Sequence, residues 1–145
     1  MSANFENNSG NLKTNEELNV ASVQSWELFD SHAHLQDSAY AAEEIPEVLD
    51  RAFNAGITRV LLPASSLADT AAAAALARKY SGLYFSAGCH PHEAAKFNAD
   101  DLERLRAYLE PTHPDRKNLR AIGEIGLDYH YDFSPRDTQK HVFEQ

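Results

Sequence analysis

The stretch that decides the fold is LFDSHAHL, residues 28–35. Its apolar start predicts a short buried strand, and because side chains alternate between the faces of a strand, Asp30, His32 and His34 share one face. Two imidazoles that point the same way at the carboxyl end of a strand are candidate ligands for a metal ion such as zinc or manganese. Asp30 lies behind them and is a candidate hydrogen-bond acceptor for a ligand. An isolated His-x-His pair is also compatible with a surface loop, so this hypothesis depends on the rest of the chain.

Apolar periodicity along the rest of the chain alternates between strand and helix. After the first strand, near residue 28, we expect strands at 57–62, 83–87 and 119–125, and helices at 41–54 and 68–80 and from about 98 and 134. Strand and helix repeat at intervals of about 25 to 35 residues, which is typical of right-handed βα units with a parallel sheet and helices outside. The sequence therefore predicts an α/β fold.

Several residues mark the expected helix ends. Pro46 suits the first turn of the first helix and Gly56 its end, while Asn98 suits the cap of the third. The segment at 134–137, SPRD, resembles a capping box for the fourth helix. That helix has no cap at its other end, so we expect the sequence to stop inside an element at Gln145.

Composition limits the classes of function. The 145 residues carry a formal net charge of −9, from 13 Lys and Arg against 22 Asp and Glu, and 43% of them are apolar. This is the composition of one globular domain with a core. Negative charge repels a phosphate backbone at long range, so any contact with nucleic acid has to be local, and we expect a metal ion to assist it.

Residues 1–25 contain six asparagines, few apolar residues and no periodicity. They cannot bury enough surface to offset the entropy lost on ordering, so we predict a disordered tail followed by a folded domain at 26–145. The tail has no apolar leader and one basic residue, Lys13, and the chain has one cysteine, Cys89. These features predict a cytoplasmic, reducing location without a targeting signal, an internal disulfide or a membrane span.

Polar residues also follow the later strands. His90 and His92 come after the third strand, and Glu124 lies at the end of the fourth between Gly123 and Gly126. Ligands of parallel α/β folds gather at the carboxyl ends of strands. Glycines on both sides permit the chain to turn sharply as it leaves the strand. If Glu124 is buried, its negative charge needs a cation, because an unpaired buried charge is costly. Taken alone, Glu124 is equally compatible with a solvated strand end.

Three segments carry a resemblance to a known family: FDSHAHL at 29–35, SAGCHPH at 86–92 and AIGEIGLDY at 121–129. In this order they resemble the TatD family of metal-dependent deoxyribonucleases, within the wider amidohydrolase group of (β/α)8 barrels. Gln139, Phe143 and Gln145 are similar to the glutamine-rich helix that follows in that family. The resemblance implies a TIM-type barrel, of which about four βα units, the N-terminal half, are present.

The resemblance also implies roles for individual residues. His32 and His34 correspond to ligands of one divalent metal ion, and Glu124 to the catalytic carboxylate that bridges to a second. His90 occupies the position near the substrate phosphate. Residues His92, Asp128 and Tyr129 are assigned to loop packing or turn capping and are left out of the predicted site.

The implied activity is hydrolysis of phosphodiester bonds in DNA with one or two divalent ions (Mg, Mn or Zn), as an exonuclease on single strands. Two alternatives stay open: an amidohydrolase that acts on a small amide or ester, and a non-catalytic half-barrel. A complete barrel takes about 250 residues, and the family supplies two further histidines and an aspartate from its later strands. We therefore expect a poor nuclease with an open barrel edge available for self-association, and no membrane partner.

Overall fold

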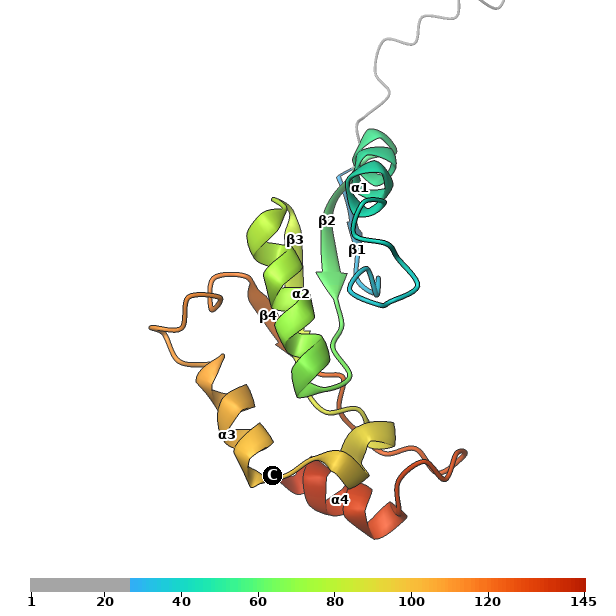
Figure 1. Cartoon of the computed structure of the whole chain (residues 1–145), viewed down its shortest axis with the longest axis vertical. Coiled ribbons are helices and arrows are strands. Elements are labelled where there is room, and N and C mark those ends of the chain that lie inside the picture. Colours follow the sequence, from blue (N-terminus) through green and yellow to red (C-terminus); the bar gives the residue numbers. More distant parts are fainter. Residues whose placement is uncertain (1–26) are drawn as a thin grey trace, which may run out of the picture.

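The computed structural model describes residues 27–145 and contains one four-stranded sheet (Figure 1). Its strands are β1 (Leu28–Asp30), β2 (Ile57–Leu62), β3 (Leu83–Ala87) and β4 (Leu119–Ile122), in the spatial order β1-β2-β3-β4. Every neighbouring pair is parallel. The predicted parallel α/β arrangement is confirmed, whereas the tail predicted at 1–25 lies outside the described residues.

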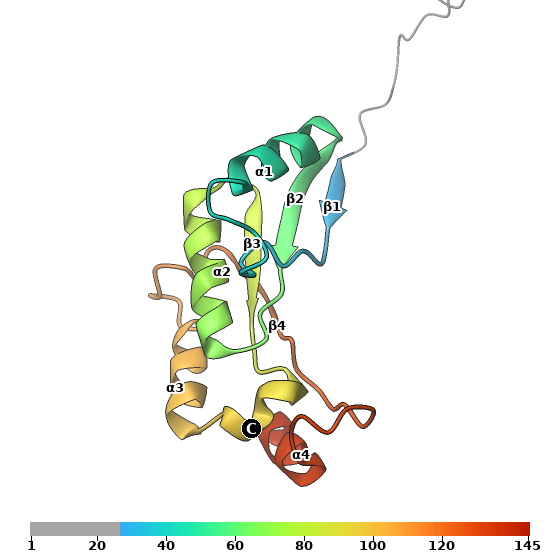
Figure 2. The same cartoon turned by 45° about the vertical axis from the view of Figure 1, so that its right-hand side comes forward.

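The helices are α1 (Ile45–Asn54), α2 (Leu67–Lys79), the 3-10 helix η2 (Pro91–Lys96), α3 (Ala99–Ala107) and α4 (Arg136–Glu144). Helix α1 packs on β2 and α2 on β3, while α3 contacts α2. Helix α4 packs instead on η2, beyond the carboxyl ends of the strands (Figure 2). In the part of the chain that the structure describes, no helix is both long and apolar enough to cross a membrane.

The core lies between the sheet and the first two helices. Leu62 and Phe85 of the sheet are fully buried, and Leu49 of α1 belongs to the same cluster. Helix α2 contributes alanines, among them Ala73 and Ala77, whose short side chains let its backbone lie close to β3. Burial of a large apolar side chain stabilises the fold by roughly 1.5 to 3 kcal/mol. The alanine-rich run is therefore a tightly packed helix face.

Side-chain caps set the starts of two helices. Ser66 accepts a hydrogen bond from the Asp69 amide (3.1 Å) at the start of α2. Asn98 accepts from the amides of Asp100 (2.9 Å) and Asp101 (3.2 Å), and the Asp101 carboxylate accepts from the Asn98 amide (3.2 Å). This reciprocal capping box confirms Asn98 as the predicted start of α3.

Two predicted boundaries differ from the structure by three residues or more. Strand β4 ends at Ile122 rather than at residue 125, because Gly123 adopts a φ of 149°, which is outside the range of a strand. Helix α1 begins at Ile45 rather than at residue 41, and residues 42–44 form a turn before it. Helix η2, which follows β3 directly, is not foreseen by apolar periodicity.

The predicted capping role of Ser134 is wrong. Its hydroxyl donates to the His92 carbonyl (2.9 Å) and accepts from the Ala95 amide (2.9 Å), so it ties the start of α4 to η2. Pro135 takes the cap position of α4 without a side-chain hydrogen bond. The fully buried Ser134 therefore serves a tertiary contact instead of a local one.

Within the described residues the sheet stays open, since β1 and β4 each pair along one side only. Large apolar side chains of these edge strands are exposed, such as Phe29 (54%) and Ile122 (59%). In a closed barrel, further strands cover such edges. The arrangement matches the predicted half-barrel.

We predict that Asn98→Ala lowers the free energy of unfolding by about 1 kcal/mol, because it leaves the Asp100 and Asp101 amides without their side-chain acceptor. Urea denaturation followed by circular dichroism measures this change. Asn98→Asp keeps an acceptor oxygen and is the matched control. Equal stability of the alanine variant and the unmodified chain would contradict the capping role.

Candidate metal centre

The three predicted ligands converge. The ligand atoms of His32, His34 and Glu124 all lie within 4.8 Å of one another. His32 Nε2 is 3.0 Å from His34 Nε2 and 3.7 Å from Glu124 Oε1. With metal–nitrogen bonds of about 2.0 to 2.1 Å, two ligands of one ion lie roughly 3 to 3.5 Å apart. The donor types, and the separations of His32 from the other two ligand atoms, are therefore close to those found around a divalent cation.

The backbone around the histidines is fixed by local contacts. Asp30 Oδ1 accepts a hydrogen bond from the His32 amide (3.0 Å), and the Ala33 amide donates to the Leu61 carbonyl (3.1 Å), which extends the pairing of β1 with β2. The contact of Asp30 is with backbone, so its predicted contact with an imidazole is not observed. Asp30 thus orients the segment that carries both rings.

Glu124 is placed by the ends of β2 and β3. Its amide donates to the Ala64 carbonyl (2.7 Å), and the Gly123 amide donates to the Ala87 carbonyl (2.9 Å). The buried Ser86 hydroxyl donates to the Gly123 carbonyl (2.6 Å) and accepts from the Ala64 amide (3.1 Å). Three hydrogen bonds thus hold the short segment that carries the carboxylate, and the fourth links two of its partners, Ser86 and Ala64.

Gly88 also contributes to the position of the Gly123-Glu124 segment, because it has no side chain. A Cβ at Gly88 would lie 2.5 Å from the Gly123 carbonyl carbon and 2.6 Å from the Glu124 carbonyl oxygen. Such contacts are too close for real atoms, so only glycine permits this approach of the two backbones. No local pattern of residues indicates this role for Gly88 or Ser86, although both stand in the second family segment.

His90, the predicted substrate-binding residue, lies outside the ligand cluster. It caps η2, where its Nδ1 accepts from the His92 amide (3.2 Å), and its own amide donates to the Ser65 carbonyl (2.8 Å). The side chain is partly buried. Its predicted role toward a phosphate stays a prediction.

His92 and Asp128 form a pair that the sequence analysis did not foresee. His92 Nε2 hydrogen-bonds to Asp128 Oδ2, and Asp128 Oδ1 accepts from the amides of His130 (2.7 Å) and Tyr131 (3.3 Å). The bond to His92 is the main cause that lowers the pKa of Asp128 to about 2, and the two amides add to it. Asp128 therefore caps the turn as expected and also fastens it to η2.

His32 and His34 line an open cleft of about 990 Å³. Four carboxylates share the lining: Asp30, Asp37, Asp69 and Glu93. A cleft lined by several carboxylates has a negative electrostatic potential, which attracts cations and repels free phosphate groups. A phosphate would therefore approach this cleft only with a bound cation.

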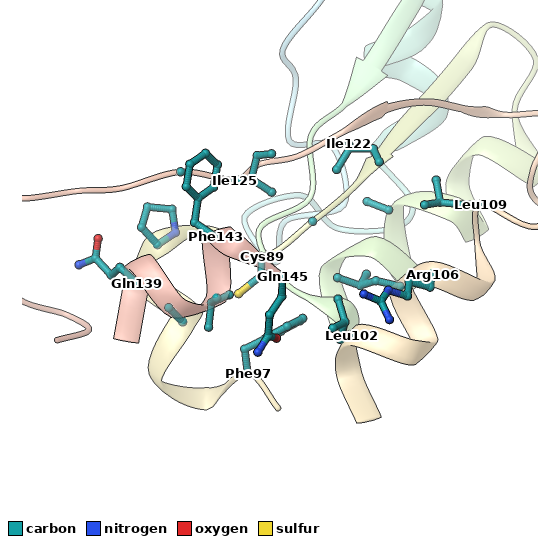
Figure 3. Close-up of a pocket in the computed structure, with 17 residues that line it drawn as sticks. Cys89, Phe97, Leu102, Arg106, Leu109, Ile122, Ile125, Gln139, Phe143 and Gln145 are labelled. Atoms are coloured by element: carbon teal, nitrogen blue, oxygen red, sulfur yellow. The ribbon is translucent and has the colours of Figure 1, made fainter. Parts of the chain in front are cut away.

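A second cavity, of about 210 Å³, has a mainly apolar lining (Figure 3), and none of the three candidate ligands belongs to that lining. It lies between α3, η2, α4 and the end of β4, with Leu102, Ile122 and Phe143 in its wall. Cys89 also lines it, and burial, with the nearby charges of Glu93 and Asp101, raises the pKa of this thiol to about 11. Cys89 is therefore a packing residue and not a nucleophile.

Comparison with known proteins places the chain in a family. The family described as TatD related DNase matches residues 29–145. This chain belongs to the TatD-related DNase family. The resemblance carried by the three sequence segments is thereby confirmed.

Curated TatD relatives are similar over the same region. The 3'-5' ssDNA/RNA exonuclease TatD of Cronobacter sakazakii is 34% identical over 116 residues, which cover 80% of this chain and 42% of the relative. The uncharacterized metal-dependent hydrolase YabD of Bacillus subtilis is 35% identical over 116 residues, which cover 80% of this chain and 43% of the relative. The chain thus spans less than half the length of these relatives.

Solved structures of TatD proteins share the fold. YJJV, a TatD homologue from Escherichia coli, superimposes with a TM-score of 0.70 at 31% identity. A TatD family hydrolase from Entamoeba histolytica gives a TM-score of 0.72 at 28% identity. Each match covers 81% of this chain and 44% of the other protein. The four βα units are therefore half of a TatD barrel.

We predict that Gly88→Ala weakens Mn²⁺ binding by about 10-fold or more, since the new Cβ must displace the segment that carries Glu124. Isothermal titration calorimetry measures the affinity. Gly82→Ala is the matched control, because its Cβ would also meet a backbone atom, the Thr58 carbonyl oxygen at 2.9 Å, but next to the amino end of β3. Equal affinities in the two variants would contradict this account.

We predict that the Cys89 thiol resists alkylation at neutral pH. With its pKa raised from 9.0 to about 11, the reactive thiolate forms only when the pH rises well above the ordinary range of a thiol. Rates of iodoacetamide labelling across pH 7 to 10 measure this in the folded chain. The same chain in urea is the control and should react as an ordinary thiol. Equal rates in the two states would show that Cys89 is accessible and unperturbed.

Proposed function

We propose that this TatD-family chain forms the N-terminal part of a metal-dependent hydrolase that cleaves phosphodiester bonds of single-stranded DNA, with exonuclease action. The observation that supports it most is the convergence of His32, His34 and Glu124 at the carboxyl end of a half-barrel. The exonuclease name of the relative from Cronobacter sakazakii supports the choice of substrate.

In this proposal His32 and His34 supply neutral nitrogen donors and Glu124 supplies the negative charge of the ligand set. Two imidazoles with one carboxylate suit zinc or manganese. Magnesium is the alternative, but it is a hard cation that prefers oxygen ligands. A divalent cation held there would supply Lewis-acid chemistry, by making water more nucleophilic near neutral pH and by offsetting negative charge on the phosphoryl group. Glu124 is the proposed catalytic carboxylate, since it alone of the three carries charge.

His90 is the proposed contact to the substrate phosphate. Its backbone is held by Ser65, and its ring stands edge to face against the His92 ring at 4.3 Å between centroids. A ring fixed in this way loses little conformational freedom when it binds a ligand. Its Nδ1 accepts from the His92 amide, so a neutral ring would carry its proton on Nε2 and would donate it to a phosphate oxygen.

The non-catalytic half-barrel is the second candidate, and one observation favours it. Among residues 27–145 the ligand cluster holds three residues, whereas two metal ions together need roughly twice as many. We therefore expect the 145-residue chain to be a weak nuclease as a monomer. Self-association through the exposed edges of β1 and β4 is one way in which further groups would reach the site.

We predict that the purified chain with Mn²⁺ releases nucleotides from a labelled single-stranded oligonucleotide at well under about 1 per second, and that Glu124→Gln abolishes this release. The glutamine keeps the size of the side chain and removes its charge. Denaturing electrophoresis follows the products, and light scattering gives the oligomeric state of each sample.

Three outcomes would change the proposal. Glu124-dependent turnover of about 1 per second or faster from a monomer would show that three ligands suffice. Equal cleavage by the Glu124→Gln variant would show that the nuclease activity does not use this centre. Metal-dependent hydrolysis of a small ester without any nucleotide release would favour the amidohydrolase alternative.

A further inference from the structure

The loop from Asp128 to Ser134, here called the aromatic loop, projects between β4 and α4 beyond the carboxyl ends of the strands (Figure 2). It contains Tyr129, Tyr131 and Phe133, and all three side chains are exposed. The metal centre, with Glu124 four residues before the loop, lies at the same end of the sheet. The proposed function assigns no role to this loop.

The first end of the aromatic loop is fastened by Asp128. Its carboxylate binds His92 of η2 and the amides of His130 and Tyr131. Its amide donates to Gln139 Oε1 of α4 (2.8 Å). This end of the loop therefore has contacts to two helices and to its own turn.

The second end is fastened by two buried polar side chains. Ser134 bonds to the backbone of η2 through the His92 carbonyl and the Ala95 amide, and Gln139 Nε2 donates to the Ser134 carbonyl (2.8 Å). Ser134 and Gln139 are each 1% exposed. A loop held by buried hydrogen bonds at both ends presents its rings in a defined arrangement.

The exposed rings continue a row of rings that begins at His90. His90 contacts His92 (4.3 Å between centroids), His92 contacts Phe133 (4.7 Å) and Phe133 contacts Tyr131 (5.6 Å). Phe133 is 66% exposed and Tyr131 52%, so the far end of the row offers ring surface to solvent. The row thus leads from the proposed phosphate contact to an exposed aromatic surface.

We propose that Tyr131 and Phe133 form a stacking platform for the bases of a single-stranded nucleic acid, an inference that rests on the proposed function. Stacking of a base on an aromatic ring contributes binding energy without a positive charge on the protein, so a chain of net charge −9 can offer it. A duplex keeps its base faces stacked inside, so the platform selects single strands. The Arg136 guanidinium lies 5.1 Å from the Tyr129 ring centroid. It adds a positive charge beside the loop that would attract the phosphate backbone of the nucleic acid.

The test measures binding by fluorescence anisotropy, with EDTA present so that no metal-dependent cleavage occurs. The probes are a labelled thymidine oligonucleotide and an abasic phosphodiester strand of the same length and charge. We expect the full chain to bind the thymidine probe about 5-fold or more tightly than the abasic strand. The double variant Tyr131→Leu/Phe133→Leu, which keeps apolar surface but removes the rings, should lose this preference.

Two further variants control the test. Tyr131→Phe keeps the ring and should keep the preference, and Phe53→Leu removes an exposed ring of α1, next to the amino end of β2, and should also keep it. Equal binding of the two probes by the full chain, or an unchanged preference in the double leucine variant, would overturn the inference. Base-dependent binding without Glu124-dependent cleavage would instead refute the proposed hydrolase and leave the platform in place.

Discussion

The candidate metal centre depends on the hydrogen bonds that hold the Gly123-Glu124 segment against the ends of β2 and β3. The Glu124 amide binds the Ala64 carbonyl, and the Ser86 hydroxyl links Ala64 to Gly123. Gly88 leaves the space that this close approach requires. Because these contacts are between backbones and one buried hydroxyl, they place the carboxylate before any cation binds, which reduces the ordering that binding has to impose.

The curvature of the sheet is the second requirement for this site. Strands β1 and β4 are the first and last of four, and three strand spacings of about 4.8 Å would separate them by roughly 14 Å in a flat sheet. Side chains of a flat sheet stand nearly perpendicular to it and would not bridge that distance. The ligand atoms of His32 and Glu124 nevertheless lie 3.7 Å apart. A curved sheet of the barrel type therefore brings the candidate metal ligands together, although β1 and β4 are not paired.

Two surfaces lie at the same end of the sheet, the acidic cleft beside the histidines and the aromatic loop. In the proposal each would bind a different part of the substrate. Carboxylates line the cleft beside the histidines and favour a cation there, which explains how an acidic chain would hold a phosphate. The aromatic loop offers exposed rings on which bases would stack in the proposed platform, and negative charge on the protein does not weaken stacking itself. The His92-Asp128 pair joins the two surfaces, since it fixes the loop beside His90.

The sequence alone determined the order and type of the strands and α-helices, though not of η2, because apolar periodicity and caps such as Asn98 act within a few residues. Strand alternation and the flanking glycines made His32, His34 and Glu124 candidates, and the resemblance of three segments to the TatD family selected them as predicted metal ligands. Only the tertiary structure decided the hydrogen-bond partners of Ser86, His92 and Ser134. These partners are Gly123, Asp128 and His92, at distances of 37, 36 and 42 residues along the chain. Such contacts depend on strand order and sheet curvature, which no local pattern of residues specifies.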